Sequence, residues 1–288
     1  MSPRRVLISG TSSGFGALIA RKLASEGYVV FAGMRDITSR HAETAAALRA
    51  HAAERGQRLE VVELDVTSER SVADCVAHIE RSGGLDIVIH NAGVAAAGLT
   101  ETFTAEDAAQ LFGVNVFGVI RLQRAVLPLL RQSDDALVMY LSSTLAREVM
   151  PFLSLYTASK HALDALAEGW RYELSQLGIR TAIIQPGTFP TTGMITRLLP
   201  PSDPKRAEAY GDFATAPASL FGGIEAMVAA GAAPDPSLVV QGVLEALSPE
   251  APTRSVIDPN GAGGAARLNA LSHSTQAALL SGLGVSVP

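Results

Sequence analysis

A glycine-rich turn between a short apolar run and an amphipathic stretch constrains the fold of this chain more than any other feature. The apolar run covers residues 5–9, the turn reads Gly10-Thr-Ser-Ser-Gly14-Phe-Gly16, and residues 17–25 have helical periodicity and end before Gly27. This pattern predicts a strand, a tight loop and a helix. Glycines let the backbone approach a pyrophosphate, and the free N–H groups at a helix N-terminus attract its charge. The sequence therefore predicts a phosphate-binding loop, with an ordinary Gly/Ser loop as the alternative.

Strand and helix patterns alternate along the rest of the chain. The expected strands are Tyr28–Gly33, Leu59–Leu64, Leu85–His90, Ala136–Leu141 and Ile179–Gln185, and the expected helices are His41–Ala53, Ser71–Arg81, Ala105–Leu130 and Tyr156–Leu177. Strands that are apolar throughout are typical of a parallel sheet with helices on both faces. We therefore predict an α/β fold, a doubly wound parallel sheet (Rossmann fold) in three α/β/α layers, with its ligand at the carboxyl ends of the strands. We expect a single domain over residues 1–288, with residues 258–288 as a C-terminal extension in which the Gly/Ala-rich stretch Gly261–Ala266 is mobile.

Charge and composition exclude several classes of protein. A formal net charge of −5 argues against nucleic acid as a main partner. No stretch approaches the roughly 18 uninterrupted apolar residues of a membrane span, so none is predicted. The single cysteine, Cys75, rules out a disulfide within the chain and favours a reducing cytoplasm as its location. No metal site is predicted.

Tyr156 and Lys160 form a second motif. On the helix predicted there, residues four apart lie on one face, so the lysine ammonium lies near the phenol. A positive charge nearby favours the phenolate, which lowers a tyrosine pKa from about 10 toward neutrality. The chain has three lysines against twenty arginines, and arginine, with its higher pKa and different reach, could not easily take this role. The spacing indicates a tyrosine that exchanges a proton with an alcohol or carbonyl, and a chance pairing on a helix surface is the alternative.

With these two motifs the chain resembles the short-chain dehydrogenase/reductase family over roughly residues 4–257. His90-Asn-Ala-Gly93 stands where the family has Asn-Asn-Ala-Gly, so its first residue departs from the pattern. Asn115 stands where the family has its catalytic asparagine, and Ser143, thirteen residues before the motif tyrosine, where it has its catalytic serine. Pro186-Gly-Thr-Phe-Pro-Thr191 resembles the segment that grips the nicotinamide carboxamide.

The resemblance implies a reaction and the residues that perform it. Hydride passes between the nicotinamide and a carbon that bears oxygen, with Tyr156 as general acid/base and Ser143 polarising the substrate oxygen. Lys160 holds the ribose, and the backbone at Asn115 positions a water. Alternatively, Ser143 caps a turn and Asn115 is a buried amide in a helix kink. The implied cofactor-binding residues are Gly10, Ser12, Ser13, Gly14, Phe15, Gly16, Arg35, Asp65, Val66, Asn91, Ala92, Gly93, Tyr156, Lys160, Pro186, Gly187, Thr188, Phe189 and Thr191.

The form of the cofactor depends on the end of the second strand. Relatives that prefer NAD have an aspartate there, whereas this chain has Met34 followed by Arg35. An arginine can pair with the 2′-phosphate that a carboxylate would repel, so we expect NADP(H) rather than NAD(H). The alternative is that Arg35 is a solvated charge and Asp36 holds the ribose. Asp65, after the third strand, is expected to contact adenine, with a helix-capping role shared with the following hydroxyls as the alternative.

Residues 191–236 lack regular strand signals and contain several prolines among apolar side chains. We expect this segment to be a lid over the nicotinamide site, with few regular backbone hydrogen bonds of its own. Its apolar underside would face Leu145, Val149 and Phe152 and select an apolar carbonyl or alcohol substrate. The alternative is that these apolar residues are core. The resemblance is strongest to the 17β-hydroxysteroid and retinol dehydrogenase branch.

Two matters stay open on sequence alone. An alcohol/carbonyl oxidoreductase has two alternatives. One is a non-catalytic NADP(H)-binding sensor, and the other is a dehydratase or epimerase with the same Tyr/Lys pair. We also expect a homodimer or homotetramer. Its contact would use the helices around residues 118–130 and 156–177, with Leu163, Leu166, Trp170 and Leu174 as apolar positions.

Overall fold

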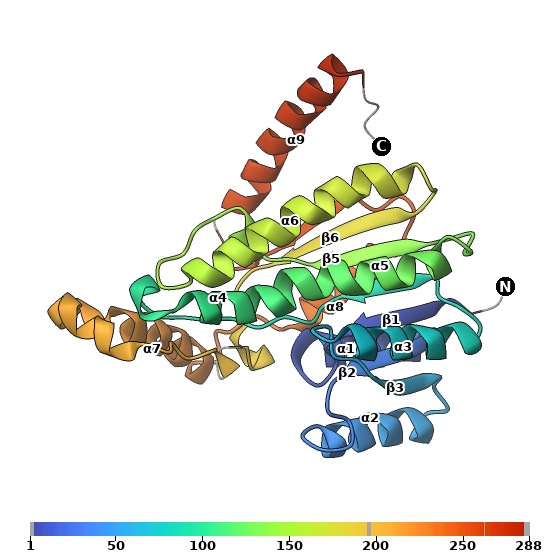
Figure 1. Cartoon of the computed structure of the whole chain (residues 1–288), viewed down its shortest axis with the longest axis horizontal. Coiled ribbons are helices and arrows are strands. Elements are labelled where there is room, and N and C mark those ends of the chain that lie inside the picture. The colour runs from blue at the N-terminus through green and yellow to red at the C-terminus, as the bar shows by residue number, and fades with distance from the viewer. Residues whose placement is uncertain (1–2, 195–196, 262, 285–288) are drawn as a thin grey trace.

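The computed structural model describes residues 3–194, 197–261 and 263–284, and its centre is a parallel sheet (Figure 1). Among these residues seven strands pair in the order β3-β2-β1-β4-β5-β6-β7, and each neighbouring pair is parallel. The strands are β1 (Arg5–Ser9), β2 (Val29–Met34), β3 (Leu59–Glu63), β4 (Ile87–His90), β5 (Leu137–Leu141), β6 (Arg180–Pro186) and β7 (Arg254–Ile257). The predicted doubly wound parallel sheet is confirmed.

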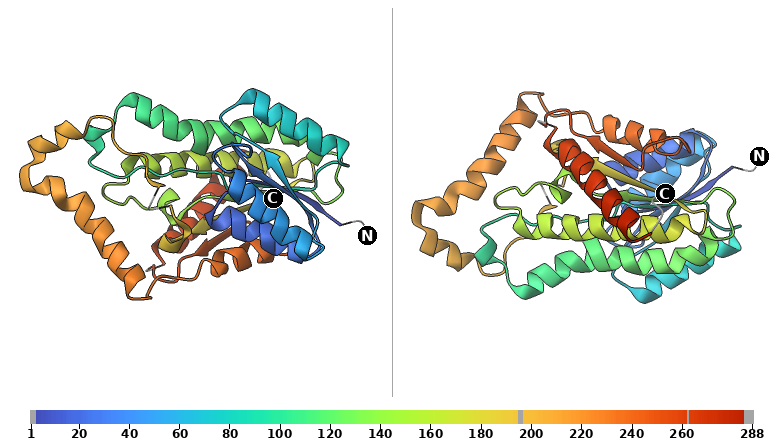
Figure 2. Two further views of the ribbon diagram at one scale, coloured as in Figure 1. Left: turned by 90° about the horizontal axis from the view of Figure 1, so that it is seen from below. Right: turned by 90° about the horizontal axis from the view of Figure 1, so that it is seen from above.

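Helices cover both faces of the sheet because its strands are apolar on both sides (Figures 1 and 2). Within β1, Val6 and Ile8 belong to one buried cluster and Leu7 to another. The first cluster is completed by α1 (Gly14–Ser25), α2 (Ala42–Glu54) and α8 (Ser237–Glu245). The second is completed by α3 (Glu69–Arg81), α5 (Gly118–Leu130) and α6 (Ser154–Ser175).

The strand order reverses between β1 and β4, since β1 pairs with β2 on one side and with β4 on the other. Loops that leave two such strands turn to opposite faces and open a crevice at their carboxyl ends, where ligands of this fold class bind. Here the glycine-rich loop follows β1 and Asn91 follows β4. The sheet therefore places the glycine-rich loop beside the segment that begins at Asn91.

The expected helix Ala105–Leu130 has three parts. They are α4 (Ala105–Phe112), a π-helical turn (Gly113–Phe117) and α5, and the turn is closed by a bond from the Gly118 N–H to the Gly113 carbonyl. π-Helical turns are frequent at functional sites, and this one contains Asn115. By length and composition alone the stretch could also cross a membrane, but half of its most apolar window is buried inside the protein, as in a core helix.

The C-terminal part differs from the sequence prediction. β7 was not predicted, and the predicted C-terminal extension contains the helix α9 (Gly264–Gly282), which projects away from the sheet (Figure 1). Ala265 is its one buried residue. The predicted scarcity of regular structure in residues 191–236 is also wrong, because Pro204–Thr215 form 3₁₀ turns and Ala216–Ala229 form the helix α7.

Two of the apolar positions expected at a subunit contact belong to the core instead. Leu163 and Leu174 are buried in the cluster that packs α6 on the sheet. Trp170 packs against the same cluster, its ring stacked on Tyr140 with centroids 6.0 Å apart. These side chains stabilise the fold of one chain, so they are no evidence for a dimer.

Candidate active site

The four predicted catalytic residues lie close to the carboxyl end of β5. Ser143 follows β5, Tyr156 and Lys160 lie one turn apart on α6, and Asn115 is in the π-helical turn that contacts α6. All four side chains are buried. Helix α6 therefore carries the tyrosine and lysine on the face that meets the loop after β5.

Ser143 has two partners. Its hydroxyl oxygen accepts a hydrogen bond from the Leu145 N–H at 3.1 Å, which caps the short turn Thr144–Ala146. Its side chain is also hydrogen-bonded to Tyr156. The turn fixes the serine, and the serine meets the phenol, so its capping role and its predicted catalytic role are compatible.

The protonation of Tyr156 differs from the sequence prediction. Burial raises the pKa of Tyr156 to about 12, and the hydrogen bond with Ser143 lowers it only in part. The Lys160 ammonium lies 5.7 Å from the centroid of the tyrosine ring and donates to the Leu141 carbonyl at 3.0 Å. The expected lowering of this pKa by the lysine is therefore wrong, because loss of water around the buried phenolate disfavours the charged form more than the Ser143 hydrogen bond favours it.

Lys160 is also buried, and burial disfavours its charged form. Burial lowers the pKa of Lys160 to about 8, while the negative charge of Asp164 acts in the opposite direction. Asp164 lies one turn further along α6. With a pKa of about 8, the Lys160 ammonium loses its proton only a little above neutral pH, and the negative charge of Asp164 favours the charged form.

The Asn115 side chain is fully engaged by the protein. Its Oδ1 accepts from the Val94 N–H at 2.9 Å, and its Nδ2 donates to the Val94 carbonyl at 2.8 Å and to Ser159 Oγ at 3.0 Å. Ser159 in turn donates to the Tyr156 carbonyl. The side chain therefore ties the loop after β4 to the catalytic helix, and any role toward a bound water belongs to its backbone.

The glycine-rich loop and the loop after β4 are held together by side chain to backbone bonds. Asn91 Nδ2 donates to the Ser9 and Gly10 carbonyls at 2.8 and 2.9 Å, and the Asn91 and Ala92 N–H groups donate to Ser9 Oγ. A Cβ at Gly16 would lie 2.3 Å from the Gly10 carbonyl oxygen and 2.4 Å from Asn91 Nδ2. A side chain at Gly16 would break this contact, so glycine is required there.

Residues at the end of β2 and β3 surround the position expected to select the cofactor. Arg35 is exposed, and within the described residues its side chain has no hydrogen bond or ion pair. Asp36 has a positive φ of 57°, and its N–H and that of Ile37 donate to the two carboxylate oxygens of Glu63 at 2.8 and 3.0 Å. Asp65 Oδ1 accepts from the Thr67 N–H and hydroxyl, while Ser68 caps α3.

The segment after β6 contacts the glycine-rich loop. Phe189 is buried and its ring meets the Phe15 ring edge to face, with centroids 5.5 Å apart. The Gly187 N–H donates to the Ile257 carbonyl at 2.9 Å. The two phenylalanine side chains therefore brace the loop, whereas Thr191 is exposed beside it.

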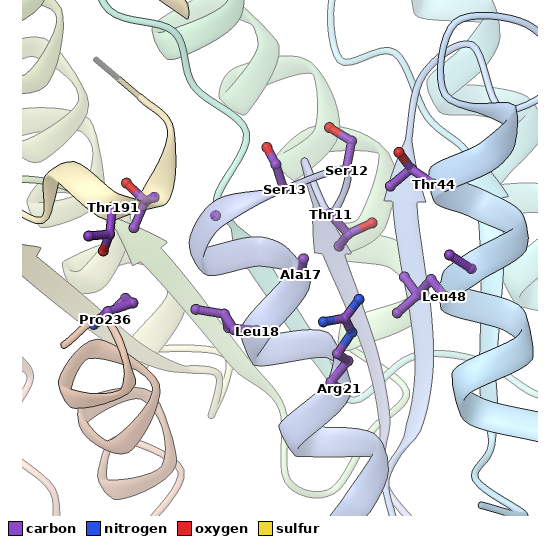
Figure 3. Close-up of a pocket in the computed structure, with 13 residues that line it drawn as sticks. Thr11, Ser12, Ser13, Ala17, Leu18, Arg21, Thr44, Leu48, Thr191 and Pro236 are labelled. Carbon is purple, nitrogen blue, oxygen red and sulfur yellow. The ribbon is translucent and has the colours of Figure 1, made fainter. Parts of the chain in front are cut away.

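A cavity of about 530 Å³ adjoins the glycine-rich loop (Figure 3). Thr11, Ser12 and Ser13 line one end, Arg21 and Thr44 lie along α1 and α2, and Thr191 and Pro236 close the other side (Figure 3). The four side chains predicted to be catalytic do not line it. The cavity is a groove along α1 that opens at the glycine-rich loop.

His90, where the chain departs from the family pattern, lies behind the site. Its ring stacks on Tyr140 with centroids 5.1 Å apart, and its Nε2 is 2.7 Å from Gln123 Oε1. Burial lowers the pKa of His90 to about 4, although the Gln123 hydrogen bond raises it. A neutral, stacked histidine is a core residue here.

Sequence reasoning missed a buried carboxylate under the site. Asp164 accepts from Arg254 Nη1 at 2.6 Å, Arg147 Nη2 at 2.8 Å, Gln185 Nε2 at 3.0 Å and Ser142 Oγ at 3.2 Å. These partners come from β7, the loop after β5, and β6. Its four-residue spacing from Lys160 was the one available signal, since the arginines lie far away in sequence.

The C-terminal helix is tied to the same carboxylate. Asn269 Oδ1 accepts from Arg147 Nε at 2.8 Å, and Asn269 Nδ2 donates to Gln185 Oε1 at 2.6 Å. We name Asp164, Arg147, Arg254, Gln185 and Asn269 the Asp164 network. Within the described residues, no group of three or more His, Cys, Asp or Glu side chains could hold a metal ion.

Comparisons with known proteins agree with this geometry. The family model described as short chain dehydrogenase matches residues 4–201. The uncharacterized oxidoreductase YusZ of Bacillus subtilis is 37% identical over 69% of this chain and 69% of its own length. Human retinol dehydrogenase 8 is 36% identical over 66% of this chain but only 60% of its own length. A variant of the actinorhodin polyketide ketoreductase, solved with NADPH, superposes with a TM-score of 0.72 at 25% identity over 91% of this chain and 97% of its own.

Proposed function

We propose, because this chain belongs to the short-chain dehydrogenase/reductase family, that it transfers hydride between NADP(H) and an alcohol or carbonyl carbon. The observation that carries the proposal is the buried hydrogen bond between Ser143 and Tyr156, with Lys160 one turn away. Such a set has a proton donor, a group that polarises oxygen and a charge that stabilises the phenolate. A protein that only bound the cofactor would have no need of it.

Each residue has a role that its surroundings support. Bound NADPH would supply the hydride. Ser143 would donate a hydrogen bond to the carbonyl oxygen, and Tyr156 would give up its phenolic proton as the oxygen gains charge. Since the pKa of Tyr156 is raised to about 12 by burial, the phenol is protonated at neutral pH and ready to donate. The Lys160 ammonium then stabilises the phenolate left behind.

The preference for NADP(H) rests on this chain's own residues. Solved proteins of this fold hold NADPH in one case and NADH in another, so the fold does not decide. Arg35 is exposed and free of partners among the described residues, and a guanidinium can pair with a phosphate through two parallel hydrogen bonds. Asp36 directs its backbone toward Glu63, as part of a turn. These features favour a 2′-phosphate beside Arg35.

The substrate side of the proposal is a mostly apolar carbonyl or alcohol. Phe152 packs against Phe213 of the lid, with ring centroids 5.8 Å apart, and no residue of α7 is buried in the body. Val149, three residues before Phe152 in the sequence, is 74% exposed. Retinol dehydrogenase 8 is named for a large apolar alcohol, and exposed apolar side chains next to the catalytic loop are consistent with a substrate of that class.

A screen of cofactor consumption tests the function. The purified chain would be mixed with NADPH or NADH and a panel of ketones, aldehydes and quinones, and absorbance of the reduced nicotinamide followed. We expect NADPH-dependent turnover with apolar carbonyls. Cofactor binding without turnover across the panel would favour a sensor, and conversion of a substrate without net cofactor consumption would favour a dehydratase or epimerase.

A further inference from the structure

The lid carries an arginine that reaches back to the phosphate-binding loop. Arg197 Nη1 donates to Ser13 Oγ, its Nε donates to the Gly193 carbonyl at 2.9 Å, and its Nη2 donates to the Thr192 carbonyl at 3.1 Å. Ser13 and Arg197 are 184 residues apart in sequence. The three bonds fix the guanidinium between the start of the lid and the loop.

The loop at this point is built to receive an anion. Ser13 directly precedes α1, its side chain does not cap the helix, and the first turn of α1 has no acidic residue. A Cβ at Gly14 would lie 3.0 Å from the Thr192 carbonyl oxygen, so the lid backbone touches the loop beside the helix N-terminus. Figure 3 shows Ser13 at the start of α1 and Thr191 on the neighbouring segment. A phosphate held by the α1 N-terminus would therefore lie next to Arg197.

Among the described residues, the charge of Arg197 has no carboxylate partner, and some of its N–H groups make no hydrogen bond. Each terminal nitrogen of a guanidinium carries two N–H groups, and each uses one here. No carboxylate pairs with Arg197 among residues 3–194, 197–261 and 263–284. Arg206 is the other arginine of the lid. It forms ion pairs with Asp203 at 2.8 Å and Glu101 at 3.0 Å. Arg197 is thus a positive charge beside the glycine-rich loop, and in the described part of the chain no carboxylate pairs with it.

We infer that Arg197 binds the pyrophosphate of the dinucleotide cofactor and so fastens the start of the lid onto the bound cofactor. The inference rests on the proposed function. The guanidinium would exchange its bond to the Ser13 hydroxyl for phosphate oxygens, which make stronger, charge-assisted bonds. Its bonds to Gly193 and Thr192 would persist, so that the cofactor and the first residues of the lid are held by one side chain.

This role predicts a pattern opposite to that of Arg35. Every dinucleotide has the pyrophosphate, whereas only NADP(H) has the 2′-phosphate. Loss of Arg197 should weaken NADPH and NADH by the same factor. Loss of Arg35 should weaken NADPH alone. The two arginines can therefore be assigned to the two ends of the cofactor by binding measurements.

The test is isothermal titration calorimetry on the full chain with NADPH, NADH, ADP-ribose and adenosine 2′-phosphate. We expect Arg197→Met to raise the Kd of the first three about 10- to 100-fold, the scale of a lost charged hydrogen bond. Adenosine 2′-phosphate, which has no pyrophosphate, should bind as before. Arg197→Lys should lose less because it keeps the charge. Arg206→Met is the matched control, since it removes a lid arginine that does not reach the loop.

The outcomes separate this inference from the function on which it rests. Unchanged Kd values for NADPH, NADH and ADP-ribose in Arg197→Met, with normal binding by the wild-type chain, would overturn the role of Arg197 alone. Equal losses in Arg206→Met would also overturn it, because a general loosening of the lid would then be the cause. A wild-type chain that binds neither dinucleotide would overturn both proposals.

Discussion

Tyr156 is held in its protonated form by burial and meets Ser143, so the phenol is the group whose removal should stop the chemistry. Tyr156→Phe keeps the ring and its packing but has no proton to donate. We expect kcat to fall at least ~10²-fold, the usual scale of general acid catalysis, while NADPH binding and the thermal unfolding midpoint change little. Steady-state kinetics and calorimetric titration measure both. Turnover close to that of the wild type would show that another group supplies the proton.

Arg35 gives the matching test at the far end of the cofactor. Its side chain is exposed and makes no hydrogen bond within the described part of the chain, so its removal should not disturb the fold. Arg35→Ala should weaken NADPH binding by roughly 1.5–3 kcal/mol, the scale of a charged hydrogen bond, and leave NADH binding nearly unchanged. Titration of both cofactors distinguishes the cases. Equal weakening of NADPH and NADH would mean that Arg35 does not contact the 2′-phosphate.

The Asp164 network joins the elements that carry the catalytic residues. One carboxylate holds β7 through Arg254, the catalytic loop through Arg147 and Ser142, and β6 through Gln185. Helix α6 contributes both this carboxylate and Lys160. The network therefore fixes the loop of Ser143 against the helix of Tyr156, and it also sets the electrostatic surroundings of the lysine.

A substitution in the network should change stability and pH dependence together. Asp164→Asn removes the carboxylate shared by the partly buried Arg147 and Arg254, although Arg254 keeps a second ion pair with Glu168 at 3.0 Å. Removal of one partner of a buried pair costs about 3–5 kcal/mol of unfolding free energy. It also removes the negative charge that raises the pKa of Lys160 from the value set by burial. The pKa of Lys160, about 8 in the wild type, should fall, because the charged form loses its support.

Reductase activity is the readout for this change. Activity should decline as the pH rises through the pKa of Lys160, since the neutral lysine no longer stabilises the phenolate. In Asp164→Asn the decline should begin at a lower pH than in the wild type, whereas Asp164→Glu keeps the charge and should restore the profile in part. Chemical denaturation and pH–rate profiles measure the two effects. Superimposable profiles in the wild type and Asp164→Asn would limit Asp164 to a structural role.

Elements with a continuous buried face could be predicted from the sequence to within one or two residues. The strand expected at Leu59–Leu64 is Leu59–Glu63, and the helix expected at Tyr156–Leu177 is Ser154–Ser175. β7 could not be predicted, because Arg254-Ser-Val-Ile257 is only partly buried and becomes a strand by pairing with β6. The same holds for the Asp164 network. Arg147 and Asn269 are 122 positions apart in the sequence, so no local sequence pattern predicts their contact.

The whole molecule should associate through the outer face of α5 and α6. The buried leucines of α6 no longer support this, but the exposed face of that helix carries the small residues Ala158, Ala165 and Gly169 at helical spacing. Phe117, just before α5, is 51% exposed. Small residues let two helices approach closely, and an exposed large apolar side chain gains from burial. We expect a dimer by light scattering at micromolar concentration.

A bulky charge on this face tests the contact. Ala165→Arg should give monomers without loss of folding, because the residue is exposed in the single chain. Ala73→Arg, an exposed alanine on α3, is the matched control and should leave the dimer intact. A wild-type chain that scatters as a monomer would contradict the prediction, as would an Ala165→Arg variant that remains dimeric.

The segment predicted to be a lid contacts the body largely through polar, exposed side chains. Arg206 and Tyr210 bind Glu101, Ser202 binds Asp107, and no residue of Pro204–Thr215 or α7 is buried. The alternative that these apolar residues are core is therefore wrong for the described lid. Helices of this length gain most of their stability from packing, so a helix with no buried face should open often.

Hydrogen exchange across residues 197–231 measures that opening. In the ligand-free chain we expect the amides of α7 to exchange far faster than those of α5 or α6, although all three are helical. NADPH should protect the start of the lid through Arg197, and an apolar ketone added with it should extend protection into α7 by packing against its exposed side chains. Arg197→Met should lose the first effect while Glu101→Gln, which weakens the bonds of Arg206 and Tyr210, should speed exchange without ligand. Protection of α7 as strong as that of α5 in the free protein would mean that the segment is fixed structure and that substrate is selected elsewhere.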